Sequence, residues 1–121
     1  MTWLEHHRTS EYYAQLADDA AHQQNPQQAK ILYSQAAQAE HLALADLNPT
    51  KTKTLGITVI SAVALNLKAN ELRRAEQTAH HWLATDLLPP FAIKALRELL
   101  LDIWQQQSLE LAIAKIGRAH V

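Results

Sequence analysis

The sequence of 121 residues contains no cysteine. This absence excludes a disulfide scaffold, catalysis by a thiolate and any zinc site that depends on cysteine ligands. The chain has only two glycines, Gly56 and Gly117, so it lacks the glycine-rich loops that bind phosphates and dinucleotides. It also has only four prolines, and this scarcity of turn-forming residues argues against an all-β fold.

A strong charge of one sign and a long apolar run are missing as well. The net charge is -1, with acidic residues outnumbering basic ones, so we expect no nucleic-acid partner. The longest apolar stretch, residues 55–67, is shorter than the ~20 residues that span a membrane. The first seven residues are polar and do not resemble a secretion signal. We therefore expect no membrane association and a cytoplasmic location.

Helical patterns fill most of the sequence. Hydrophobic residues make up 48% and charged residues 19%, as in a globular domain. Thr2 and Glu5 form a capping-box pattern, which predicts a first helix from about residue 3 to residue 23. Asn25 and Pro26 predict the start of a second helix, which ends at Asn48. Further helices are predicted to begin near Lys53, Asn70 (as a cap), Pro90 and Ser108.

The third predicted helix, residues 53–68, is apolar on nearly all sides. Its β-branched residues could also form a buried strand, but the run exceeds the usual strand length of about 4–8 residues. An all-round apolar helix is expected inside a bundle or beneath a partner. Asn66 is the polar exception, so it must find hydrogen-bond partners. We expect it to set the register of the hairpin, and contact with the backbone of a ligand is the alternative. We also expect Trp82 and Trp104 in the core.

Residues 10–43 resemble one tetratricopeptide repeat, a hairpin of two helices. The matching positions are Tyr13, Leu16, Ala17, Ala29, Tyr33 and Ala36. A weaker match covers residues 56–89, with Val59, Ala62, Val63, Ala75, Ala79, Trp82 and Pro89. Ala29 and Ala75 are 46 residues apart, whereas the family repeats every 34 residues or so. A generic helical bundle is the alternative.

The resemblance implies an all-α, right-handed array of antiparallel hairpins with five to six helices. It also implies that a groove lined by the first helix of each hairpin binds another protein or peptide. By register, the partner-binding residues are Asp18, His22, Ile57, Ile60, Ala64, Leu67 and Lys68. Lys68, Arg73 and Arg74 flank one turn and could hold acidic groups. The apolar members could be covered by later helices, by a second copy of the chain or by another protein.

Catalytic and metal-binding patterns are not found. The seven histidines include no pair spaced i,i+4, and no serine lies in a nucleophile elbow. We therefore expect no metal, no cofactor and no enzyme activity. The function predicted is that of a protein–protein interaction scaffold, adaptor or subunit. The alternative is a helical ligand-binding or enzymatic bundle with a pocket near Asn66, Glu76 and His80.

The last six residues, 116–121, are similar to a translated sequencing adapter, which reads Ile-Gly-Arg-Ala-His-Val followed by a stop. This resemblance implies a natural domain of residues 1–115 and a non-native tail of residues 116–121. The alternative is a genuine helix end with Gly117 as its cap. The adapter interpretation also allows the chain to be the first part of a longer repeat array.

Overall fold

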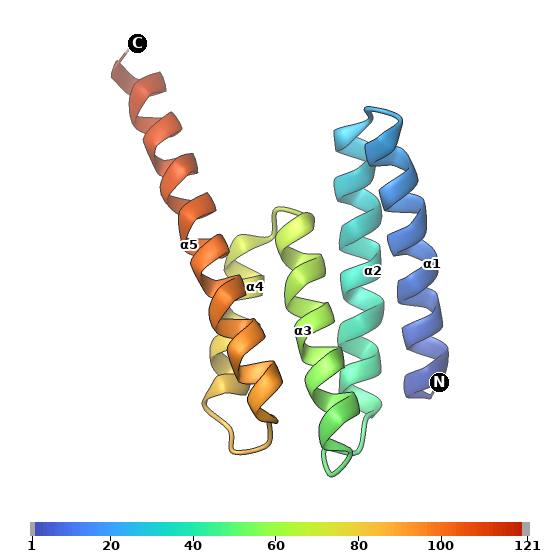
Figure 1. Cartoon of the computed structure of the whole chain (residues 1–121). Helices are drawn as coiled ribbons and strands as arrows, with labels where there is room; N and C mark the ends of the chain where they lie inside the picture. The colour runs from blue at the N-terminus through green and yellow to red at the C-terminus, as the bar shows by residue number, and fades with distance from the viewer. Residues whose placement is uncertain (1, 120–121) are drawn as a thin grey trace.

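The computed structural model describes residues 2–119, which fold into five α-helices without a β-strand (Figure 1). The helices are α1 (Trp3–His22), α2 (Pro26–Asp46), α3 (Thr52–Lys68), α4 (Leu72–Leu83) and α5 (Pro90–Ala119). The predicted all-α class is therefore confirmed, and the apolar third segment is a helix. His120 and Val121 of the adapter-like tail lie outside the described residues.

Side-chain caps begin the first two helices as the sequence predicts. The Thr2 hydroxyl oxygen accepts a hydrogen bond from the backbone N–H of Glu5 at 3.3 Å. The Asn25 side-chain oxygen accepts one from the backbone N–H of Gln28, also at 3.3 Å. Pro26 lies in the first turn of α2, where a missing N–H is tolerated. Both caps satisfy N–H groups that have no partner inside their helix.

The α1–α2 and α3–α4 turns have the same backbone conformation. Gln24 and Asn70 both adopt positive φ angles, 59° and 60°. In each turn the following residue donates its N–H to a carbonyl five positions back, from Asn25 to Ala20 at 2.9 Å and from Glu71 to Asn66 at 2.8 Å. The prediction that Asn70 caps α4 is wrong. Asn70 instead ends α3, because asparagine tolerates the left-handed conformation that this type of turn requires.

Unequal helix lengths shape the end of the molecule that carries these two turns, which we call the turn end. Helices α3 and α4 have 17 and 12 residues, whereas α2 has 21 and α5 has 30. Successive helices run antiparallel, and α5 packs against both α3 and α4. In Figure 1 the α3–α4 turn is lower than both the α1–α2 turn and the end of α5. The last part of α5 therefore extends beyond its neighbours.

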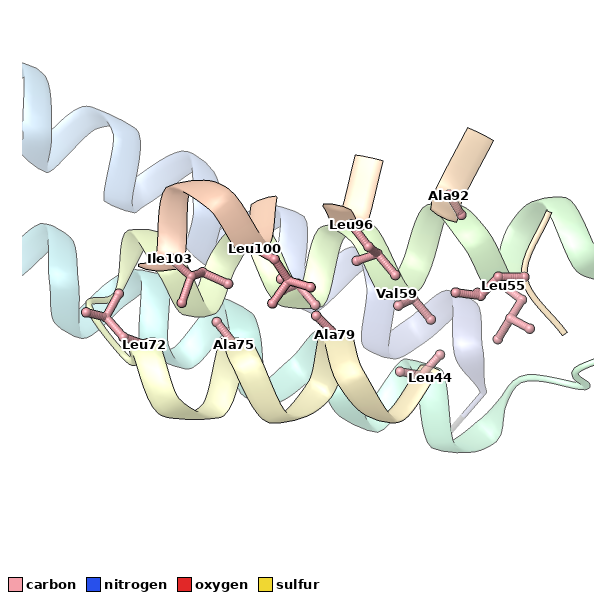
Figure 2. Close-up of a cluster of buried hydrophobic side chains, with 12 residues drawn as sticks. Leu44, Leu55, Val59, Leu72, Ala75, Ala79, Ala92, Leu96, Leu100 and Ile103 are labelled. Atoms are coloured by element: carbon pink, nitrogen blue, oxygen red, sulfur yellow. The ribbon is translucent and has the colours of Figure 1, made fainter. Parts of the chain in front are cut away.

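Two clusters of buried apolar side chains hold the helices together. The larger cluster lies mainly between α3, α4 and α5 and is rich in long aliphatic side chains (Figure 2). It includes Leu55, Val59, Val63, Leu72, Leu96, Leu100 and Ile103. The smaller cluster joins α1, α2 and the end of α3, and six of its eight members are alanines: Ala17, Ala20, Ala29, Ala36, Ala37 and Ala69. Small side chains at a helix contact allow the axes to approach closely.

Gly56 allows the start of α5 to lie directly against α3. A β-carbon at this position would lie 3.0 Å from the side chains of Pro89 and Ala92. That distance is shorter than ordinary van der Waals contact between carbon atoms, about 3.5–4.0 Å. Gly56 therefore marks a close packing contact and not a phosphate loop.

Two further predictions and one alternative interpretation are wrong for the second half of the chain. No sixth helix begins at Ser108, because α5 passes through it without a break. The residues around Ser108 are glutamine, leucine and glutamate, which are good helix formers. Gly117 does not cap the helix, which continues to Ala119. Trp104 is 43% exposed and is not a core residue, since its position on α5 lies beside α4 at the protein surface.

Candidate functional site

The predicted apolar stripe on α3 is mostly covered. Ile60 and Leu67 are partly buried and pack against the larger core cluster, to which α5 contributes. Ala64 is also partly buried. Ile57 alone among the four keeps a large exposed fraction, 46%. The stripe is therefore largely covered within the chain, by its own later helices, and does not form an open face.

The other predicted site residues gather at the turn end. Lys68, Arg73 and Arg74 are exposed around the α3–α4 turn. Asp18 and His22 lie near the end of α1, where the His22 ring N–H donates to the Asp18 carbonyl at 2.7 Å. The structure thus separates the predicted set, because Ile57 lies near the beginning of α3 and the polar members lie at or beyond the opposite end of the helices.

Three depressions join across the turn end into one surface feature, which we call the end groove. The first has a volume of about 510 Å³ and lies over Ala29, Tyr33 and the α1–α2 turn. It shares Lys30 and Lys68 with a second depression of about 500 Å³. The second shares Asn70 and Glu110 with a third of about 650 Å³. The end groove therefore runs from the α1–α2 turn, past the α3–α4 turn, to α5.

Four cations line the end groove: Lys30, Lys68, Arg73 and Arg74. In residues 2–119 every ion pair involves a histidine, so none of these four side chains has a carboxylate within 4.0 Å. The Lys68 ammonium lies 5.4 Å from the centre of the Tyr33 ring, a cation–π distance. Sequence reasoning missed Lys30, because its place in the groove depends on how the two hairpins pack.

Acidic groups also line the groove, but they are fewer. Glu71 is already engaged, accepting hydrogen bonds from Ser34 at 3.0 Å and from the Asn66 amide at 3.0 Å. Asp102 and Glu110 remain as carboxylates without a cation within ion-pair distance. The groove is therefore lined by four cations and three carboxylates, an excess of one positive charge.

Tyr33 forms part of the apolar floor of the groove and is tied to α1. Its hydroxyl donates a hydrogen bond to the Asp18 carboxylate. Burial, together with this hydrogen bond, raises the pKa of Tyr33 to about 12. Asp18 therefore holds a groove residue in place and its carboxylate is already occupied by that residue. The predicted direct role of Asp18 in partner binding stays a prediction.

The end of α5 beyond the α3–α4 turn is apolar and uncovered. Leu109, Leu111 and Ile113 are 53%, 57% and 60% exposed. Leu109 and Ile113, four residues apart, lie on one face of the helix, and Leu111 lies on the nearly opposite face, because residues two apart differ by about 200°. We call residues 109–115 the α5 extension. Leu111 also lines the third depression of the end groove, so the two surfaces are continuous.

Asn66 connects the two hairpins. It is 3% exposed and accepts a hydrogen bond from the His41 ring on α2 at 2.7 Å, while its amide donates to Glu71. Burial lowers the pKa of His41, although the hydrogen bond to Asn66 opposes that change. These bonds fix α3 against α2, in agreement with the expected register role. The sequence did not indicate His41 and Glu71 as partners of Asn66.

The alternative pocket would need Asn66, Glu76 and His80 to face one another. The hydrogen bonds of Asn66 and Glu76 go to other partners. Glu76 accepts a hydrogen bond from the Trp104 indole at 2.7 Å, and its nearest approach to His80 is 3.9 Å. The hydrogen bonds from Trp104 and Gln107 lower the pKa of Glu76. Glu76 therefore serves to hold α4 against α5, whereas Asn66 holds α3 against α2.

One buried carboxylate was not predicted. Glu40 is fully buried on α2 and lies 2.9 Å from Nδ1 of His7 on α1. The other ring nitrogen of His7 lies 3.1 Å from Glu11, and the Trp3 ring stacks on His7 at 4.9 Å. Both ring nitrogens of His7 therefore face carboxylate oxygens, one from each of the two helices. The cluster is a cross-link between α1 and α2.

The structure adds two findings on other functional classes. Within residues 2–119 no group of three histidine, aspartate or glutamate residues is placed to hold a metal ion. In the same residues no helix combines the length and hydropathy that crossing a membrane requires. Comparisons with protein-family models, with curated proteins and with solved structures gave no match.

Proposed function

We propose that this protein is an interaction module, a scaffold, adaptor or subunit that binds another protein and has no catalytic activity of its own. The observation that carries the proposal is the α5 extension, where Leu109, Leu111 and Ile113 are each more than half exposed beside the end groove. A helix that is apolar on several sides is normally covered. Exposed apolar surface next to polar residues is typical of protein contacts.

We also propose that the two hairpins, α1–α2 and α3–α4, are related as tetratricopeptide-like repeats. Their turns support this relation, because Gln24 and Asn70 share one conformation and are 46 residues apart. Ala29 and Ala75 have the same separation and are buried, with 4% and 0% exposed. A repeat array of this kind would serve to present a binding surface.

The contact surface proposed differs from the predicted stripe. Ile60 and Leu67 are engaged in the core, so they cannot supply a large apolar contact without opening the fold. The turn end offers Lys68, Arg73 and Arg74 together with the α5 extension. We therefore place partner binding at the turn end and not along the length of α3.

Site-specific photo-crosslinking in the cells that express the protein tests this proposal. A photoreactive residue replaces Ile113 on the α5 extension, and the control replaces Leu42, which is 54% exposed on α2. We expect a discrete heavier product from position 113 and none from position 42. No product from position 113, or the same diffuse products from both positions, would contradict an interaction surface at the turn end.

A further inference from the structure

We propose that the end groove binds an acidic amphipathic helix from a partner protein. This inference rests on the proposed interaction function and names the chemistry of the partner. The groove includes Lys30, Tyr33 and Leu111, and of the predicted stripe on α3 it includes only Leu67. Its charge, its shape and its apolar floor each favour such a helix.

Charge favours an acidic occupant. Among residues 2–119, no carboxylate lies within ion-pair distance of Lys30, Lys68, Arg73 or Arg74, and these cations occur along the whole groove. The groove also has three carboxylates, those of Glu71, Asp102 and Glu110, so its cations exceed its carboxylates by one. The oxygens of Glu71 already accept hydrogen bonds from Ser34 and Asn66. Complementary charge across an interface speeds association and selects partners.

Shape favours a helix. The groove is elongated, because its three depressions share residues at each junction. It has apolar surface at both ends, from Ala29 and Tyr33 near the α1–α2 turn and from Leu111 on α5. A helix with one apolar face can fill such a groove and place its acidic face toward the surrounding cations. The α5 extension offers that helix a neighbour to pack against.

A second copy of the chain fits this groove less well. The segment of a second copy with the most closely spaced exposed apolar side chains is its own α5 extension, residues 109–115, whereas Ile31 and Leu42 on α2 are isolated. That segment contains one acidic residue, Glu110, and one basic residue, Lys115. It therefore has no excess negative charge to offset the four cations. The partner is accordingly a different, acidic protein.

A designed probe peptide takes the place of the partner helix in the test of this proposal. The probe is a fluorescein-labelled synthetic helix of about 18 residues, with leucine on one face and glutamate on the other. A matched probe has lysine in place of every glutamate. Fluorescence anisotropy measures the binding of each probe to the full chain. We expect the glutamate probe to bind and to weaken with added salt, and the lysine probe not to bind.

Charge-reversed variants locate the binding. The double variant Lys30→Glu/Lys68→Glu changes two exposed groove residues, so folding is retained and circular dichroism checks it. The control, Lys53→Glu/Lys94→Glu, makes the same charge change at the other end of the molecule. We expect the groove variant to bind the glutamate probe at least about tenfold more weakly and the control variant to bind within about twofold of the unmodified chain.

Several results would overturn the proposal. These are equal binding of both probes, equal weakening by both double variants, and no binding of the glutamate probe. A molar mass by light scattering that rises with concentration and returns to the monomer value in Leu111→Ser would assign the groove to a second copy. If the crosslink from position 113 forms while the glutamate probe fails to bind, the interaction function stands and the acidic helix is wrong. If both fail, both proposals are wrong.

Discussion

The two halves of the molecule are held together by different means. The hairpin α1–α2 packs through alanines and is cross-linked by polar contacts, His7 with Glu40 and Tyr33 with Asp18. The helices α3, α4 and α5 pack through leucine, isoleucine and valine around side chains such as Ile103, as Figure 2 shows. The stability of the first half therefore depends on close helix packing and specific polar contacts. The stability of the second half depends on the area of apolar surface that it buries.

The substitution with the largest expected effect is Ile103→Ala in the second half. Ile103 is fully buried between α3, α4 and α5, so its removal leaves a cavity. We expect the free energy of unfolding to fall by about 4 kcal/mol, measured by urea denaturation. Leu101→Ala on the same helix is the control, because Leu101 is 60% exposed. A similar loss in both variants would contradict a core of long aliphatic side chains.

The second-largest loss of stability is expected from His7→Ala in the first half of the molecule. This change leaves the buried carboxylate of Glu40 without its partner. We expect a loss of about 3 kcal/mol in the free energy of unfolding. Replacing the neighbouring, exposed Arg8 by alanine should have little effect. If His7→Ala were as mild as Arg8→Ala, the α1–α2 hairpin would not depend on its polar cross-link.

A smaller effect is expected from Ala36→Leu. Ala36 is fully buried in the alanine cluster, so the added carbon atoms must push α1 away or distort α2. The expected loss is about 2 kcal/mol, measured in the same urea experiment. Gln35→Leu adds a comparable side chain at the adjacent exposed position. Equal stability of the two variants would show that the helices are not held at close distance by alanine.

The smallest effect concerns His41, at the junction of the two halves. Burial lowers the pKa of this histidine in the folded chain, so the unfolded chain binds a proton at higher pH. The stabilising neutral form is fully populated above the ordinary value of about 6.5, and stability is lost as the pH falls below it. Urea denaturation at neutral and at mildly acidic pH should show a larger decrease for the natural chain than for His41→Gln. An equal decrease would show that His41 does not contribute.

Much of this fold could be predicted from local sequence patterns. The caps at Thr2 and Asn25 and the helix starts at Pro26 and Pro90 reflect chemistry within a few residues. The role of Asn70 was predicted wrongly, because asparagine suits both a cap and a left-handed turn, and only the length of α3 decides between them. The break predicted at Ser108 was wrong because serine is only mildly unfavourable inside a helix.

The candidate site was less predictable, because it depends on packing between distant segments. The register of the repeat resemblance selected Ile60 and Leu67 for the binding groove but could not show that the core covers them. Lys30 and Leu111 are 81 positions apart and line one groove only because α3 and α4 are short. The tetratricopeptide-like relation and the adapter-like origin of residues 116–121 stay predictions.

The central claim is that the turn end is a binding surface, and chemical-shift mapping tests it most directly. The glutamate probe is added to the isotopically labelled chain, and the backbone amide shifts are followed by NMR. The account predicts that the affected amides cluster around Lys30, the α3–α4 turn and the α5 extension, with little change near Ile57 and Lys94. Shifts concentrated at the opposite end of the molecule, or no shifts at saturating probe, would contradict it.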